Sequence, residues 1–121
     1  MSQRLYKAKA DHNDEWVVGY YLEVGGVPFI LPEGKPLNAI VQVRPETVCQ
    51  CVGMIDRNGI TSFEFDKVFD PNVRKTFLIK SDKELSGFLL VDEAGWETKD
   101  ISRLFYCEIV GNIYDKVVSH A

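Results

Sequence analysis

Hydrophobic residues occur along this chain in short runs that are separated by Gly, Pro, Asn and Asp. The runs are rich in Val, Ile, Phe and Tyr, the β-branched and aromatic residues that favour strands. In one run Phe63 and Phe65 alternate with Glu64 and Asp66, so the two pairs should face opposite sides of a strand. The pattern predicts a mainly β fold with strands over Leu5–Ala8, Trp16–Glu23, Val27–Leu31, Ala39–Val43, Val48–Met54, Ile60–Val68, Lys75–Ile79, Phe88–Val91, Phe105–Val110 and Ile113–Val118.

Two segments between these runs predict tight turns. The pair Gly25-Gly26 separates two apolar runs and predicts a hairpin. The segment Asp56–Gly59 is the clearest turn in the chain, because Asn58 and Gly59 tolerate positive φ. The strands on either side of this turn should therefore pair with each other.

Other segments predict a bulge and short helices. Gly111-Asn112 predicts a bend or bulge between the closing strands, because both residues accept positive φ. Ser81–Leu85 predicts one helical turn with Ser81 as its N-cap, and Thr98–Leu104 predicts a short helix. We expect at most these one or two short helices.

Length and charge narrow the class of protein. A chain of 121 residues predicts a single domain, 1–121. Its 14 basic and 18 acidic residues give a net charge of −4, which disfavours nucleic acid and anionic membranes as main partners. The sequence lacks an apolar run of the ~20 residues that span a bilayer, and it begins with a polar segment. We expect a cytoplasmic protein with no membrane partner.

Three carboxylates form the first candidate site. Glu64 and Asp66 are two residues apart, and Asp56 lies across the predicted hairpin. Clustered carboxylates can bind Mg²⁺ or Ca²⁺ or divide acid and base roles. The alternative is structural: Asp56 closes its turn, and Glu64 and Asp66 cap loop amides or face water. We favour the structural alternative.

Cysteine and histidine give weaker candidates. Cys49, Cys51 and Cys107 could bind zinc with His12 or His120, but the Cys-x-Cys spacing is unusual for zinc and free cysteines pack well in cores. Neither histidine lies in a catalytic motif, and no phosphate-binding glycine loop is present in the sequence. We therefore predict no catalytic residue, no metal site and no cofactor.

Aromatic residues offer a candidate interaction surface. Core packing is expected for most of a set that contains Trp96. Trp16 and Tyr20 are four residues apart on a predicted strand and should share a face, whereas Tyr21 should face the other way. We predict that the possible interaction surface comprises Trp16, Tyr20, Glu64 and Asp66.

Three separated motifs stand at Glu15–Tyr20, Glu46–Gly59 and Glu108–Tyr114. In this order they resemble the Trp-Val-x-Gly-Tyr element, the longest motif and the closing motif of the YopX family of phage- and prophage-encoded proteins. The family-motif residues, which we expect to be mostly structural, are Trp16, Gly19, Gln50, Gly53, Asp56, Asn58, Gly59, Glu64, Asp66, Gly111, Asn112 and Tyr114.

The resemblance implies a mainly β fold containing a small SH3-like barrel core with additional strands. It implies no molecular activity. Phe65 stands where the family usually has Gly, so we expect the local turn to differ, since positive φ would be strained for Phe. Cys49 and Cys51 also replace other residue types, which counts against a shared metal site.

Three functional hypotheses follow. The first is a phage or prophage accessory protein that acts as a non-enzymatic protein-interaction module, as a homo-oligomer or with a host or phage protein partner. The second is a nucleic-acid-associated accessory protein that binds single-stranded DNA or RNA through aromatic residues of a β-barrel. The third is a metal-dependent enzyme that uses Asp56, Glu64 and Asp66. We favour the first.

Overall fold

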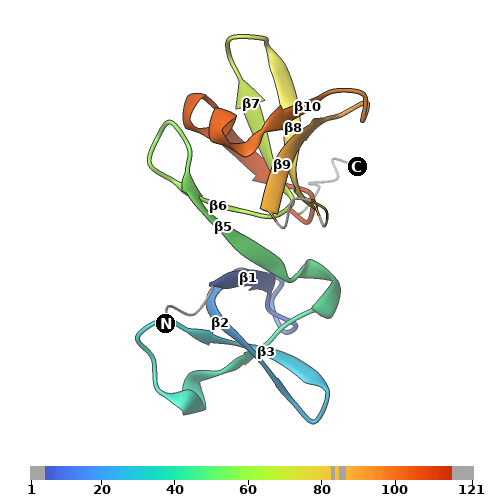
Figure 1. Ribbon diagram of the computed structural model, residues 1–121. Helices are drawn as coiled ribbons and strands as arrows, with labels where there is room; N and C mark the ends of the chain where they lie inside the picture. The colour runs from blue at the N-terminus through green and yellow to red at the C-terminus, as the bar shows by residue number, and fades with distance from the viewer. Residues whose placement is uncertain (1–4, 83, 85–86, 116–121) are drawn as a thin grey trace, which may run out of the picture. The chain divides into compact units, whose positions relative to one another are not determined.

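The computed structural model describes residues 5–82, 84 and 87–115 (Figure 1). It confirms the mainly β fold class, in which antiparallel strands are joined by turns and short 3-10 helices. The described strands do not close into a complete barrel. The chain forms two compact units, Met1–Cys51 and Val52–Ala121, and strand β5 (Cys49–Ile55) runs from the first into the second.

The first unit is built on one antiparallel sheet. Its strands and helices are β1 (Tyr6–Lys9), β2 (Trp16–Val24), β3 (Val27–Pro32), η1 (Leu37–Ala39), β4 (Val41–Gln42) and η2 (Pro45–Thr47). Within the unit the strand order is β4-β3-β2-β1, followed by the start of β5. The predicted hairpin at Gly25-Gly26 is confirmed, with φ values of 60° and 83° that glycine adopts without strain.

Alternation along β2 separates a core face from an outer face. Val17 and Tyr21 pack with Tyr6 against a buried cluster of Ala8, Ile30 and Val43. Trp16 and Tyr20 lie on the opposite face, as predicted, because successive strand residues alternate. The first unit thus has its own small core.

Gly19 is required by a close approach between two strands. A Cβ atom at Gly19 would lie 2.0 Å from the backbone oxygen of Leu31 and 2.8 Å from the Cα atom of Pro32. Both atoms belong to the backbone of β3, which cannot move away as a flexible side chain could. This family-motif position is therefore structural.

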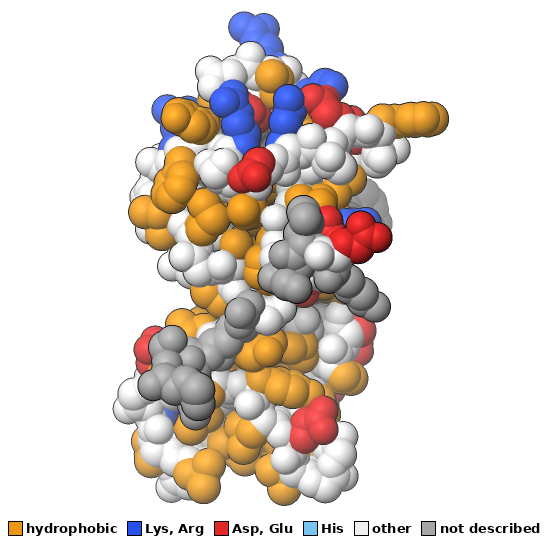
Figure 2. All heavy atoms as spheres, in the orientation of Figure 1, with side chains coloured by type: hydrophobic (Ala, Val, Ile, Leu, Met, Phe, Trp, Pro, Cys, Tyr) orange, Lys and Arg blue, Asp and Glu red, His pale blue; other side chains and the backbone are white. Residues whose placement is uncertain are grey.

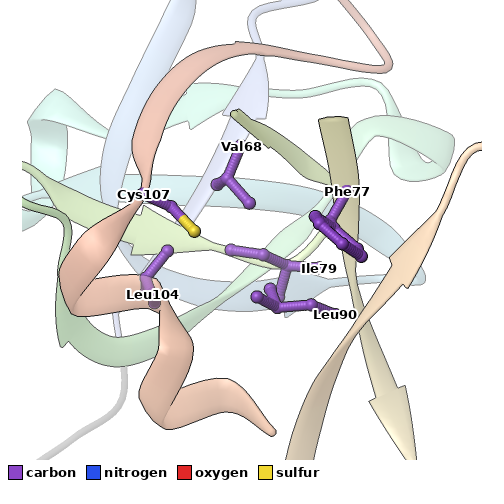
Figure 3. Close-up of a cluster of buried hydrophobic side chains, with 6 residues drawn as sticks. All are labelled: Val68, Phe77, Ile79, Leu90, Leu104 and Cys107. Atoms are coloured by element: carbon purple, nitrogen blue, oxygen red, sulfur yellow. The ribbon is translucent and has the colours of Figure 1, made fainter. Parts of the chain in front are cut away.

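The second unit contains a five-stranded antiparallel sheet in the order β10-β9-β8-β7-β11 (Figure 1). The strands and helices of this unit that follow β5 are β6 (Thr61–Phe63), β7 (Asp66–Asp70), β8 (Lys75–Asp82), β9 (Gly87–Asp92), β10 (Thr98–Asp100), η3 (Ile101–Tyr106) and β11 (Glu108–Asn112). The buried core residues of this unit, which Figure 3 draws as sticks, are Val68, Phe77, Ile79, Leu90, Leu104 and Cys107.

The predicted continuous strand over Ile60–Val68 is wrong. β6 ends at Phe63 and β7 begins at Asp66, and the bend between them has Phe65 at φ 70°. The expectation that this turn would avoid positive φ is also wrong. Phe65 N–H donates to the Ile79 carbonyl at 2.8 Å, and its ring lies edge-on to Tyr114 with centroids 5.8 Å apart. These contacts offset the strain of the left-handed conformation.

Several boundaries near the end of the chain also differ from the predictions. Gly111-Asn112 lies inside β11, and the predicted bulge occurs one residue earlier, since the pairing register shifts between Ile109 and Gly111. Neither residue of this pair has positive φ. The predicted strand Phe105–Val110 begins only at Glu108, because η3 extends to Tyr106.

The remaining differences are short. Ala39 belongs to η1, so the strand predicted over Ala39–Val43 contains only Val41–Gln42. Ser81 continues β8 and is no N-cap, while residues 83 and 85–86 of that prediction lie outside the described residues. Thr98–Leu104 divides between β10 and the 3-10 helix η3, so the predicted short helix is confirmed in part.

Two further predictions concern the chain as a whole. Ile113–Asp115 forms a turn where a last strand was predicted, and residues 116–118 lie outside the described part. None of the helices in the described ranges has the length and apolar character of a transmembrane helix.

Candidate interaction surface

The Asp56 carboxylate closes its own turn, as the structural alternative predicted. Its Oδ1 accepts hydrogen bonds from Asn58 N and Ile60 N at 2.8 and 2.9 Å, and its Oδ2 accepts one from Ile109 N at 2.9 Å. Burial alone would raise the pKa of this carboxyl, but the three backbone donors outweigh it and hold the pKa below its ordinary value. These three hydrogen bonds stabilise the turn and its contact with β11.

The Asp66 carboxylate holds a second structural junction, so its predicted place on an exposed surface is wrong. The side chain is 1% exposed; Oδ2 accepts from Phe63 N at 2.9 Å, and Oδ1 accepts from Asn112 Nδ2 at 2.8 Å. Asn112 Oδ1 in turn accepts from Tyr114 N at 2.9 Å. The structure thus brings several motif residues together, but as a buried clamp between the start of β7 and the end of β11.

A partly buried ion pair joins β7 to η3. Asp70 is fully buried and accepts hydrogen bonds from Arg103 Nε and from Asn72 N, both at 2.9 Å. Burial alone would raise the pKa of the Asp70 carboxyl, but these donors lower it. This carboxylate is also part of the fold.

The other motif residues lie at turns and strand contacts. Gly53 and Gly59 have φ values of 85° and 79°, which explains glycine at both positions. Gln50 pairs with Tyr6 across the β1–β5 ladder of the first unit. Of the predicted interaction residues in the second unit, only Glu64 is partly exposed, at the bend beside Phe65.

Two of the three cysteines are buried thiols, and Cys51 is partly exposed. Cys49 and Cys107 are fully buried, and their Sγ atoms donate to the Thr47 and Arg103 carbonyls at 3.2 and 3.4 Å. Burial raises the pKa of the Cys107 thiol to about 11, which makes it a poor nucleophile. No cluster of three or more metal-ligating residues occurs in the part of the chain that the structure describes, which leaves His120 outside.

Trp16 is covered by lysine side chains in the first unit. Lys7 Nζ and Lys9 Nζ lie 4.6 and 4.8 Å from the ring centroid, within the range of cation–π attraction. Trp16 and Tyr20 are both partly buried. Their role as an interaction surface stays a prediction.

Trp96 is an exception to the core packing expected for most of the aromatic residues. It is 90% exposed at the turn between β9 and β10. Hydrophobic side-chain atoms project into solvent in Figure 2 where Figure 1 draws this turn. Residue type alone gave no signal that this tryptophan would lie outside the core.

Several interactions brace the turn that carries Trp96. Asp92 Oδ1 accepts from Trp96 N and Glu97 N at 2.8 and 3.1 Å, and Gly95 adopts φ 76°. Glu97 pairs with Lys75 Nζ at 2.8 Å and Lys99 Nζ at 3.0 Å. These two lysines lower the pKa of Glu97 to about 2. The braced turn holds the exposed tryptophan on an ordered backbone.

A groove of about 300 Å³ lies beside this turn, on the outer face of the five-stranded sheet. Its apolar surface comes from Leu78, Val91 and Ile113, and its cationic side chains are Lys67 and Lys80. The volume is at the lower end of ligand pockets, which usually measure about 300–1,000 Å³. The groove and Trp96 together form the candidate interaction surface.

No family model matches this chain, and no curated protein matches it. The resemblance to the YopX family therefore stays a prediction.

Proposed function

We propose that the protein is a non-enzymatic protein-interaction module that contacts its partner through the surface around Trp96. The 90% exposure of Trp96 on a braced turn carries this proposal. Burying a large apolar side chain is worth roughly 1.5–3 kcal/mol, and tryptophan is among the residues enriched at binding hot spots. A partner that covers Trp96 gains this free energy without first having to order the turn.

The buried carboxylates weigh against the metal-dependent enzyme. Asp56, Asp66 and Asp70 accept hydrogen bonds from the protein itself on both side-chain oxygens. Of the three residues proposed for such an enzyme, only Glu64 is partly exposed. A single carboxylate is a poor site for Mg²⁺, which prefers several oxygen ligands.

The proposal includes a YopX-like phage or prophage origin and a cytoplasmic location in the bacterial host. The backbone at Phe65 supports the YopX part, because φ is 70° at the position where that family usually has Gly. The partner is a host protein, a phage protein or a second copy of this chain.

A photo-cross-linking amino acid at position 96 tests the proposal in bacterial cells. We expect a discrete cross-linked product, identified by mass spectrometry as one protein partner or as a homodimer. Position 37 is the matched control, because Leu37 is 67% exposed in η1 of the first unit. Absence of a product at position 96, or the same products at both positions, would contradict the proposal.

A second candidate function is binding of single-stranded nucleic acid, and one patch favours it. Phe105 and Tyr106 are 51% and 58% exposed and line a hollow with Arg57. Arg103 lies 5.0 Å from the Tyr106 ring centroid. Exposed aromatic rings beside arginine can stack bases. Oligonucleotide binding that weakens steeply with salt and with Tyr106→Ala would support this candidate over the first.

A further inference from the structure

The groove beside the Trp96 turn crosses three strands of the second unit. Lys67 of β7 lies opposite Leu78 of β8, and Leu78 lies opposite Val91 of β9. The neighbours of these residues, Val68 and Phe77, belong to the core. Because strand residues alternate, the row Lys67–Leu78–Val91 lies on the face away from the core.

The two lysines of the groove are neighbours, and neither forms an ion pair with a carboxylate in the part of the chain that the structure describes. Lys80 is two residues beyond Leu78 on the same strand face, so it is the diagonal neighbour of Lys67. The Cα atoms of such diagonal neighbours are typically about 7–8 Å apart. Within residues 5–82, 84 and 87–115 neither lysine has an ion pair, whereas Lys75, Lys99 and Arg103 each have one. Two adjacent cations that form no ion pair within the described residues create a local site for an anionic group in a chain whose net charge is −4.

The acidic residues of the groove lie at its other end. Asp92 and Glu93 belong to the end of β9 and the turn, near Thr76, whereas Lys80 lies opposite Leu89. The Asp92 Oδ1 atom is already hydrogen-bonded to Trp96 N and Glu97 N. The groove therefore has a basic end, an apolar centre and an acidic end.

We infer that this groove binds an extended segment of a partner protein in which an acidic residue stands next to an aliphatic one. The acidic side chain lies between Lys67 and Lys80, and the aliphatic side chain covers Leu78 and Val91. The groove is lined by Ala94 and Gly95 of the turn that carries Trp96, so the same segment continues toward the tryptophan. The inference rests on the proposed function and names the chemistry of its partner.

Selection from a library of displayed random peptides on the immobilised full chain tests the inference. We expect enrichment of peptides with Asp or Glu beside Leu, Ile or Val. Each of the variants Lys67→Glu and Lys80→Glu should weaken binding of the enriched peptides about tenfold, which corresponds to about 1.4 kcal/mol. Both lysines are exposed, so circular dichroism should show that the variants remain folded.

Lys35→Glu is the matched control, because Lys35 is an exposed lysine in a loop of the first unit and the charge change is the same. Its affinity for the peptides should stay within about twofold of the unmodified chain, since distant surface charges are screened. Enrichment without acidic residues, or equal losses in all three variants, would overturn the inference.

The two proposals fail in different ways. A cross-linked partner at position 96 whose binding is unaffected by Lys67→Glu and Lys80→Glu would overturn the groove inference and leave the proposed function standing. Peptides that depend on both lysines but bind equally well to Trp96→Ser would contradict the role of the tryptophan and support the groove.

Discussion

At the residue scale, the Asp56 carboxylate should contribute measurably to stability. Asn at this position keeps one acceptor oxygen, but its amide nitrogen would face a backbone N–H such as that of Ile109. Hydrogen bonds to charged groups are worth roughly 1.5–3 kcal/mol, so we expect Asp56→Asn to lower the free energy of unfolding by about 2 kcal/mol at neutral pH. Urea denaturation measures this difference.

The effect of Asp56→Asn should depend on pH. The pKa of Asp56 is lowered in the folded protein, so its stabilisation is complete above the unfolded value of about 3.9 and is lost as pH falls through the folded value. The difference between the two proteins should therefore shrink in acid. Asp11→Asn, at an exposed turn residue, is the control, and a difference that stays constant down to about pH 2 would contradict the prediction.

Phe65 provides a second prediction at this scale, because its φ of 70° favours glycine. Phe65→Ala and Phe65→Gly both lose the ring contact with Tyr114, but only Ala retains the strain. We expect the Gly variant to be more stable than the Ala variant by about 1 kcal/mol in chemical denaturation. Tyr20 in β2 is the control position: there the Ala variant should be more stable than the Gly variant. If the Gly variant were the more stable one at both positions, the φ of residue 65 would not be the cause.

At the scale of the element, Gly19 should decide whether β2 and β3 can pair. The Cβ of Ala would overlap the backbone of Leu31, so we expect Gly19→Ala to lower the free energy of unfolding by about 3 kcal/mol. Gly111→Ala is the control in a strand, because its Cβ would meet only the Asp115 side chain, at 3.1 Å. Thermal denaturation compares the two, and equal losses would contradict a steric cause at Gly19.

Elements were predictable from the sequence where their determinants are local. The hairpin at Gly25-Gly26 follows from alternation and two glycines, and the structure has both. The break at Phe65 has no such local signal, since Phe rarely adopts positive φ and the bend is held by Ile79 and Tyr114. The apolar run at Phe105 suits a strand equally well, and tertiary packing of η3 decides against it.

At the scale of the whole molecule, residues of the candidate site were also predictable only where their contacts are local in sequence. The structural role of Asp56 was predictable because two of its donors are two and four residues away. Asp66 was misplaced because its side-chain partner Asn112 is 46 residues away. Exposure of Trp96 and the pairing of Lys67 with Leu78 depend on strand order, which periodicity does not determine.

Whether the two compact units unfold together tests the prediction of a single domain. Ile30 belongs to the core of the first unit and Leu90 to that of the second. Ile30→Ala and Leu90→Ala should each lower the free energy of unfolding by about 2–5 kcal/mol. We expect each substitution to destabilise β2 and β8 equally. The reason is that β5 pairs with β1 at its start and with β6 further on. Unfolding of either unit therefore removes one pairing partner of this shared strand.

Native-state hydrogen exchange of the β2 and β8 amides measures this coupling. If the chain is a single domain, Ile30→Ala lowers the free energy of amide exchange in β8 by as much as in β2. Leu90→Ala likewise lowers it by the same amount in both strands. Val18→Ala is the control, because Val18 is 42% exposed and its truncation should leave both strands nearly unchanged. Faster exchange confined to the unit that carries each core substitution would instead establish two separate domains, since the shared strand would then fail to transmit the loss.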